Sequence, residues 1–361
     1  MKTFADASQA GHTPSFFLQR GRVRRNFEVP ERAAALEAAL HRMGLAPATP
    51  QPLAPGALAA VHRADYIDFL ATAAAEWAKL PDPGPEAVAN IHPVPEMVAN
   101  GGRTGDNRLP VRVRVQGGAG AGPSKVALPG SCAADTVCPI GPGSWAAIQG
   151  AAACALAAAA EAAKGGVAYA LCRPPGHHAY AGRAGGHCYV NNAALAAPHL
   201  RDAGAARVAI LDIDSHHGNG TQGIFWERGD VLTISIHGDP DNYYPWFVGR
   251  THERGAGAGD GRNMNMPLPF GTPDEGWLDA LRYALAPIRD FKADALVVAL
   301  GFDASKDEPL GALAVTEDGF ARAGQMIGAL GLPTAITQEG GYNVDLIGTL
   351  LERFLNGWAA A

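Results

Sequence analysis

The chain has 361 residues, of which 47% are hydrophobic and 18% are charged, so it can bury a large core as a globular protein. Its formal net charge of -6 at pH 7 gives no reason to expect binding to nucleic acid. Arg20, Arg22, Arg24 and Arg25 form a short, interrupted basic cluster, which predicts a solvated loop.

Cysteine usage and apolar patterning indicate a cytoplasmic protein that does not enter a membrane. The five cysteines are odd in number and form no Cys-x-x-Cys pair, which favours a reducing compartment. Residues 1–12 lack the apolar stretch of a signal peptide. Residues 145–164 are mostly alanine and carry Gln149 and Glu161, so they predict a helix packed through small side chains rather than a membrane span.

The first third of the chain reads as helices and loops. One helix is predicted to begin at Pro30 and end at Gly44, with apolar residues at helical spacing between them. A second helix is predicted over residues 65–80. Residues 81–130 are rich in Pro, Gly and Asn and predict a long loop insertion within a single domain of residues 1–361. A functional surface loop and a disordered insertion without function are both open.

From about residue 140 onward, short apolar runs alternate with polar segments and helices. Five runs are short, aliphatic and non-alternating: residues 167–171, 208–211, 231–236, 295–300 and 333–337. Such runs are typical of parallel strands that are buried on both faces. They predict one large α/β unit.

Polar motifs follow each run at the point where its strand would end. They are Arg-Pro-Pro-Gly-His-His (173–178), Asp-Ile-Asp-Ser-His-His-Gly-Asn-Gly (212–220), His-Gly-Asp-Pro (237–240), Gly-Phe-Asp-Ala-Ser (301–305) and Glu-Gly-Gly-Tyr (339–342). Because ligands bind outside the carboxyl ends of parallel strands, we expect these motifs to meet in one site.

A metal site is predicted where two of these motifs meet. Alternate side chains of an extended segment share a face, so Asp212, Asp214 and His216 are expected to project together. Asp303, after another strand, can supply a further oxygen. Asp214, His216 and Asp303 would leave open positions for water and substrate, which is typical of a catalytic Zn²⁺ site. A structural salt bridge is the alternative for one motif alone, but five converging strand ends favour a metal.

Other common catalytic motifs are missing from the sequence. It has no G-x-x-x-x-G-K-[ST] phosphate loop and no G-x-S-x-G nucleophile elbow. Cys188 shows no sign of thiolate activation and is expected to be a small buried residue beside the site.

In combination the strand-end motifs resemble the histone deacetylase superfamily, including bacterial acetylpolyamine amidohydrolases and histone-deacetylase-like amidohydrolases. The resemblance rests on R-P-P-G-H-H, G-G-H-C-Y-V-N-N-A-A, L-D-I-D-S-H-H-G-N-G-T-Q and Q-E-G-G-Y, and it covers nearly the whole chain. It implies a three-layer α/β/α fold with a mostly parallel sheet, shared with arginase, and hydrolysis of acetylated amines to amine and acetate. Zn²⁺ is the implied ion, with Fe²⁺ and Co²⁺ left open as the native metal.

The resemblance also implies roles for the residues around the metal. His177 and His178 match paired histidines that manage the proton, with Asp212 as the partner of His177 and Asn219 as that of His178. A histidine that faces a carboxylate tends to stay charged, whereas one that faces an amide can remain neutral. His178 is therefore expected to act as general base and general acid, and His177 as an electrostatic helper. Tyr342 matches the tyrosine whose hydroxyl stabilises the tetrahedral oxyanion.

Further ligands and partners follow from the resemblance. A structural monovalent cation, commonly K⁺, would match these positions: Asp212, Asp214, His216, Ser235 and Ile236. The expected partners are a small acetylated amine and further copies of the chain, as a homodimer or homotetramer in which the 81–130 insertion narrows the tunnel. Neither nucleic acid nor a membrane is expected.

The predicted substrates are small acetylated amines such as acetylputrescine or acetylcadaverine, with acetyl-lysine in proteins or peptides as the alternative. Gly186 and His187 match the tunnel wall, where the family usually has Phe or Tyr in place of His187. Acidic residues that attract a cationic amine are expected ahead of residue 142, where Asp135 is favoured over Glu96 and Asp106.

Two more distant functions are alternatives to a deacetylase. An arginase-like ureohydrolase needs paired metals, whereas Ser305 and His217 stand where further acidic ligands would help. An inactive module that binds acetylated partners would not need the complete ligand set or Tyr342.

Overall fold

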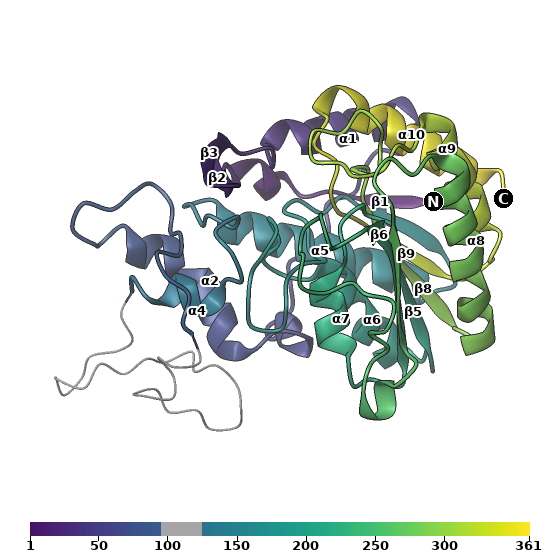
Figure 1. Ribbon diagram of the computed structural model, residues 1–361, viewed down its shortest axis with the longest axis horizontal. Coiled ribbons are helices and arrows are strands. Elements are labelled where there is room, and N and C mark those ends of the chain that lie inside the picture. Colours follow the sequence, from purple (N-terminus) through teal and green to yellow (C-terminus); the bar gives the residue numbers. More distant parts are fainter. Residues whose placement is uncertain (95–124) are drawn as a thin grey trace.

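A seven-stranded sheet forms the centre of the molecule in the computed structural model, which describes residues 1–94 and 125–361 (Figure 1). The strand order is β1-β4-β9-β8-β5-β6-β7, and each neighbouring pair runs parallel. The strands are β1 (Lys2–Phe4), β4 (Val167–Ala170), β5 (Val208–Asp212), β6 (Val231–Gly238), β7 (Asn263–Leu268), β8 (Ala295–Leu300) and β9 (Thr334–Gln338). Parallel pairing brings their carboxyl ends to one edge of the sheet.

Alternate residues of the central strands face two separate cores, because successive side chains of a strand point to opposite faces. In β5, Ala209 and Leu211 pack in a core shared with α1 (Pro30–Arg42), α8 (Asp274–Phe291), α9 (Glu317–Gly328) and α10 (Val344–Ala359). Val208 and Ile210 pack in a core shared with α5 (Ser144–Ala162), α6 (Asn192–Asp202) and α7 (Asn219–Phe225). Helices therefore cover both faces of the sheet in three layers (Figure 1).

Helix α5 packs closely against the sheet because its buried face is built largely of alanine. Within the described part of the chain it is the one helix that is long and apolar enough to cross a membrane, and 61% of that stretch is buried inside the fold. Its place in a core accounts for its apolar composition, as the sequence predicted.

The first third of the chain contains strands that the sequence did not predict. β1 takes the edge of the sheet beside β4, and β2 (Phe16–Gln19) pairs with β3 (Arg22–Arg25) in an antiparallel hairpin. The arginine cluster forms this hairpin rather than a loop, although its side chains are exposed as expected. Arg20 and Gly21 both have positive φ, 51° and 74°, as a tight hairpin turn requires.

The described ends of the 81–130 segment belong to the folded body. Ala87 forms an antiparallel bridge with Ile140, and α4 (Leu128–Cys132) begins within the segment. Ala87 and Cys132 share a third hydrophobic core with residues of α2 (Ala64–Trp77). Both described ends of the expected insertion are therefore in contact with the folded body, and the insertion over residues 81–130 stays a prediction.

Candidate active site

Asp214, His216 and Asp303 lie together beyond the carboxyl ends of β5 and β8, where the sequence predicted a metal site. One liganding atom of each lies within 4.8 Å of the other two, and His216 Nδ1 is 3.2 Å from Asp214 Oδ1 and 3.0 Å from Asp303 Oδ2. Both carboxylates are buried. Main-chain N–H groups hold their other oxygens, since Gly340 donates to Asp214 at 2.8 Å and Ser215 donates to Asp303 at 2.8 Å.

Two glycines make room for these carboxylates. A Cβ on Gly301 would lie 2.0 Å from Asp214 Oδ2, and a Cβ on Gly340 would lie 2.2 Å from Asp303 Oδ2. Real side chains do not approach so closely. The glycines of the Gly-Phe-Asp and Glu-Gly-Gly-Tyr motifs are therefore steric requirements of the cluster.

The donor set fits a divalent metal ion. Although burial opposes it, the nearby His177 and His216 hold the pKa of Asp214 well below its usual range, whereas burial and the Asp214 charge raise the pKa of Asp303. Two buried carboxylates this close together are costly without a cation between them. Two carboxylates and one imidazole are ligand types of catalytic zinc, and Fe²⁺ and Co²⁺ accept them as well.

His177 and His178 reach the partners predicted for them. His177 Nδ1 lies 2.9 Å from Asp212 Oδ2, and although burial opposes it, Asp212 and Asp214 raise the pKa of His177 well above its usual value. His178 Nδ1 lies 2.6 Å from Asn219 Oδ1, and burial together with His177 lowers the pKa of His178 well below its usual value. Because an amide oxygen can only accept, Nδ1 of His178 carries the proton and Nε2 keeps a free lone pair.

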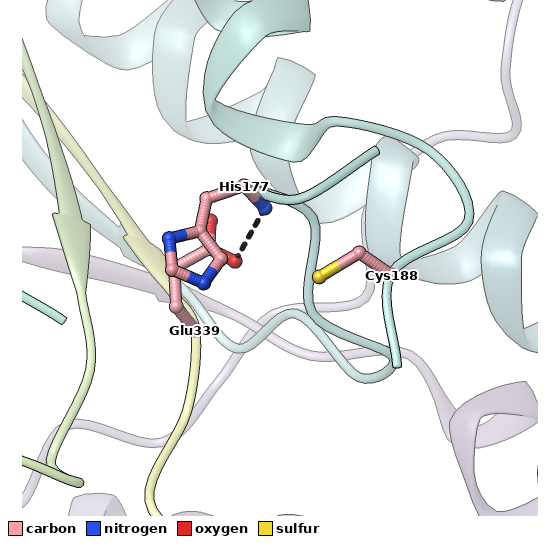
Figure 2. Close-up of side chains that lie close together, drawn as sticks. All are labelled: His177, Cys188 and Glu339. Carbon is pink, nitrogen blue, oxygen red and sulfur yellow. Dashed lines mark hydrogen bonds between the residues drawn. The ribbon is translucent and has the colours of Figure 1, made fainter. Parts of the chain in front are cut away.

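A buried carboxylate beside the histidine pair, Glu339, was not predicted as a site residue. Its Oε2 accepts hydrogen bonds from Gly176 N at 2.6 Å and His177 N at 3.0 Å, and Figure 2 shows the second of these bonds. Glu339, His177 and Cys188 lie close enough to hold a metal. However, His177 is paired with Asp212, and burial raises the pKa of the Cys188 thiol well above its usual value. We interpret Glu339 as a residue that holds the loop of Gly176 and His177 in place. The sequence signal that could have identified it is the charged residue within the Q-E-G-G-Y motif.

Tyr342 lines the cavity that also reaches His178 and His216. Its main-chain N–H donates to Glu308 Oε2 at 2.9 Å, and the Arg32 guanidinium lies 4.7 Å from the centre of its ring. Burial raises the pKa of Tyr342 well above its usual value, so its hydroxyl stays protonated and can donate a hydrogen bond.

A buried ion cluster joins the first third of the chain to the site, and the sequence did not reveal it. Glu28 pairs with Arg32 on α1, and its Oε1 lies 2.8 Å from Arg173 Nε at the start of the Arg-Pro-Pro-Gly-His-His motif. Arg32 Nε also donates to Gly341 O at 2.5 Å, next to Tyr342. Charged side chains are rarely buried this deeply unless they are paired. The cluster therefore links α1 to the loop that begins at Arg173 and to the loop that contains Gly341.

A cavity of about 340 Å³ leads from the surface to the site. Its buried lining includes His178 and Tyr342, and its exposed lining includes Trp246 and Phe270, which are 48% and 51% exposed. A cavity of this size suits a small molecule.

His187 lines this cavity, as predicted for the tunnel wall. Both His187 and the preceding Gly186 have positive φ: it is 67° for His187 and 54° for Gly186. A Cβ on Gly186 would lie 2.3 Å from the His178 ring, so the close approach of the turn requires glycine there.

Two adjacent tyrosines complete the site and were not predicted. Tyr243 stacks on His216 with ring centroids 4.4 Å apart, and Tyr244 lies edge-on to His178 at 4.8 Å. They follow the His-Gly-Asp-Pro motif at the end of β6, and this position after a strand end is the sequence feature that could have identified them as site residues.

Asp135 does not line the cavity, although it was predicted to attract the amine. Its Oδ2 accepts hydrogen bonds from Gly186 N at 3.0 Å and from the Tyr244 hydroxyl at 2.6 Å, and its Oδ1 accepts one from Val137 N at 2.9 Å. Both oxygens are therefore engaged by the protein itself. The other two acidic candidates lie outside the described residues: Glu96 and Asp106.

Three of the five residues predicted for a monovalent cation, Asp212, Ser235 and Ile236, lie on the neighbouring strands β5 and β6, whereas Asp214 and His216 follow the end of β5. Asp212 on β5 pairs in register with Ser235 on β6, and Ile236 follows. Asp212 Oδ1 accepts a hydrogen bond from Asp214 N at 3.1 Å, and Ser235 Oγ lies 2.9 Å from His237 Nδ1.

His217, considered for an arginase-like second metal, has other partners. Its Nε2 lies 3.1 Å from Gln222 Oε1 and 3.1 Å from Asn265 Oδ1. Across residues 1–94 and 125–361, neither group with metal-ligand spacing includes it.

An α/β fold that presents an aspartate–histidine–aspartate cluster beside paired histidines and a tyrosine defines a metal-dependent hydrolase. Comparison with family models narrows this class, because the histone deacetylase domain matches residues 26–358. The chain belongs to the histone deacetylase family.

Individual relatives support this placement. The acetylpolyamine amidohydrolase of Burkholderia pseudomallei is 45% identical over 362 residues, which cover 100% of this chain and 99% of that protein. A crystal structure of acetylpolyamine aminohydrolase from the same organism matches this structure with a TM-score of 0.90 at 44% identity, covering 100% of this chain and 99% of that one. Histone deacetylase 15 of Arabidopsis thaliana is 41% identical over 183 residues, 50% of this chain and 33% of that protein. These matches confirm the predicted family, the α/β fold class and the expectation of a hydrolytic deacetylase.

Proposed function

We propose that this chain is a zinc-dependent deacetylase that hydrolyses small N-acetylated amines, acetylpolyamines such as acetylputrescine or acetylcadaverine, to the amine and acetate. The observation that carries the proposal is the cluster of Asp214, His216 and Asp303, because its His216 lines the same cavity as His178 and Tyr342. The likeness to acetylpolyamine amidohydrolases along the whole chain supports this class of substrate.

Asp214, His216 and Asp303 would hold the ion. When bound, it supplies Lewis-acid chemistry, which polarises a carbonyl and makes water a stronger acid. The fit rests on the donor types, on their burial and on the space that the glycines leave around the carboxylates.

His178 accepts the proton of the attacking water at Nε2. The Asn219 oxygen holds the ring through Nδ1, and the low pKa of His178 keeps the ring neutral before the reaction. The same nitrogen then gives the proton to the leaving amine. His177, charged through its bond to Asp212, stabilises negative charge that develops nearby.

The Tyr342 hydroxyl donates a hydrogen bond to the carbonyl oxygen as negative charge develops on it. The high pKa of Tyr342 keeps this proton in place. Arg32 against the ring and Glu308 at the main-chain nitrogen hold the residue in position.

Several further features belong to the same proposal. We infer a structural K⁺ near Asp212 and Ser235, supported by their pairing in register. A single domain of residues 1–361 is supported by β1 and β9, which lie in one sheet although they come from opposite ends of the chain. A cytoplasmic location is supported by the five cysteines, all free and buried. We also infer that copies of the chain assemble into a homodimer or homotetramer.

Acetate release from a panel of acetylated amines, with and without a chelator, tests the proposal. We expect turnover of acetylputrescine or acetylcadaverine, loss of activity with the chelator, and recovery when Zn²⁺ is added. An acetyl-lysine peptide at equal concentration should react more slowly. Preference for the peptide would favour a protein deacetylase, and no turnover of any acetylated amine would favour an acetyl-binding module.

A further inference from the structure

One carboxylate oxygen joins two separate parts of the cavity lining. Asp135 Oδ2 accepts hydrogen bonds from Gly186 N at 3.0 Å and from the Tyr244 hydroxyl at 2.6 Å. Gly186 precedes His187 in a turn on one part of the lining, and Tyr244 supplies another part. Because both donors share this oxygen, moving it would move both parts.

The turn that carries His187 is tight and strained. Gly185 and Cys188 are hydrogen-bonded in both directions, at 3.0 Å and 2.8 Å. The two residues between them, Gly186 and His187, both have left-handed φ, which is easy for glycine but unfavourable for a residue with a β-carbon. The His187 conformation therefore needs support from outside the turn.

Asp135 supplies that support at the end of a short ladder. Ala184 N donates to Cys132 O at 2.8 Å, and Ala134 N donates to Ala184 O at 2.7 Å. The following donor, Gly186 N, meets the Asp135 side chain. The side chain thus extends the ladder by one bond and anchors the strained turn.

Tyr244 brings the same anchor close to the catalytic histidine. Burial and the Asp135 charge raise the pKa of Tyr244 well above its usual value, so the phenol keeps its proton and donates a hydrogen bond to the carboxylate. The Tyr244 ring packs edge-on against His178, with centroids 4.8 Å apart. The position of this ring therefore affects both the width of the cavity and the setting of His178.

Resting on the deacetylase function proposed above, we propose that Asp135 is a positioning residue that sets the spacing between the His187 turn and Tyr244 and thereby selects slender, unbranched acetylated amines. Its oxygens already bond to Gly186, Tyr244 and Val137, so it acts through these residues rather than by attracting a cationic amine directly.

Two variants of the full chain, Asp135→Ala and Tyr244→Phe, test this role with three substrates. These are acetylcadaverine, the uncharged N-pentylacetamide and a branched acetyl-lysine peptide. Asp135→Ala should lower kcat/KM about tenfold for both slender substrates, since hydrogen bonds to a carboxylate are lost. Asp135→Ala should also lower the preference for slender over branched substrates. Tyr244→Phe should lower this preference too, but by a smaller factor. Adding Tyr244→Phe to Asp135→Ala should change little more, because the shared bond is already gone.

The uncharged substrate separates positioning from charge attraction. If Asp135→Ala slows acetylcadaverine but leaves N-pentylacetamide unchanged, Asp135 attracts the cation and the positioning role is overturned. Asp68→Ala removes an exposed carboxylate on α2 and serves as the control, with wild-type selectivity expected.

Crystal structures of the wild type and Asp135→Ala provide a readout that does not depend on activity. We expect the His187 turn or the Tyr244 ring to shift in the variant. An unchanged lining would overturn the positioning role even if the wild type is active. An inactive wild type would count against the proposed function, and the two structures would still decide the role of Asp135.

Discussion

His177 and His178 are neighbours in the sequence and their rings lie 4.0 Å apart, yet their partners give them opposite properties. The Asp212 carboxylate beside His177 favours the imidazolium, whereas the Asn219 amide beside buried His178 does not. At the scale of single residues, the choice between a carboxylate and an amide therefore assigns the charge of each histidine.

Replacing Asn219 by Asp should disturb this assignment. The new carboxylate should raise the pKa of His178, and a protonated ring cannot accept a proton from water. We expect kcat/KM at pH 7 to fall and the acidic limb of its pH profile to move to higher pH. Asn219→Ala, which adds no charge, should lower the rate without that shift. A wild-type profile for Asn219→Asp would contradict the role of His178 as base.

The Tyr342→Phe variant tests the oxyanion contact. Loss of one donor to a developing oxyanion should lower kcat by roughly 100- to 1,000-fold with little change in KM. The fold should survive, because the contact of the Arg32 guanidinium with the ring and the main-chain bonds to Glu308 remain. Steady-state acetate release measures the effect, and Tyr283→Phe on the exposed face of α8 is the control. Wild-type kcat in Tyr342→Phe would rule out this contact.

At the scale of elements, the loops after β8 and β9 set the space around the carboxylates. Gly340→Ala places a methyl group 2.2 Å from Asp303 Oδ2, so the carboxylate must move. We expect a lower metal content per chain by elemental analysis. Gly84→Ala is the matched control, because a Cβ there meets no atom within 4 Å. Equal metal content in the two variants would argue against Asp303 as a ligand.

Helix α1 offers a comparison of a buried and an exposed ion pair. Arg32→Ala leaves Glu28 buried with one partner fewer, and loss of a buried partner typically costs about 3–5 kcal/mol of the free energy of unfolding. Arg42→Ala on the same helix breaks an exposed pair with Glu352 and should cost about 1 kcal/mol or less. Denaturant unfolding of both variants checks this difference. Similar losses would show that the buried cluster contributes no special stability.

The buried strands of the sheet could be predicted, whereas its two edges could not. β5 and β8 are short aliphatic runs buried on both faces, which is a strong local signal. β1 has three residues and offers too little pattern. β7 buries Asn263 and Asn265 in a polar network and leaves its methionines half-buried, which inverts the usual apolar pattern.

At the scale of the whole molecule, the site combines local motifs with contacts across the chain. Asp214, His216, Asp303 and the histidine pair could be predicted because each follows a strand end. Arg32 could not, since its hydrogen bond to Gly341 spans 309 positions and nothing in the sequence around Arg32 points to that contact. The role predicted for Asp135 rested on the family resemblance and on its place ahead of residue 142, whereas its hydrogen bonds to Gly186 and Tyr244 are visible only in three dimensions.

Metal content and deacetylase activity, measured on the same preparation, test the central claim most directly. We predict about one divalent metal ion per chain, activity on acetylcadaverine that disappears with that ion, and recovery when Zn²⁺ is returned. Asp303→Ala should lose both metal and activity. Full activity after complete removal of the metal would contradict the assignment of Asp214, His216 and Asp303 as the catalytic metal site.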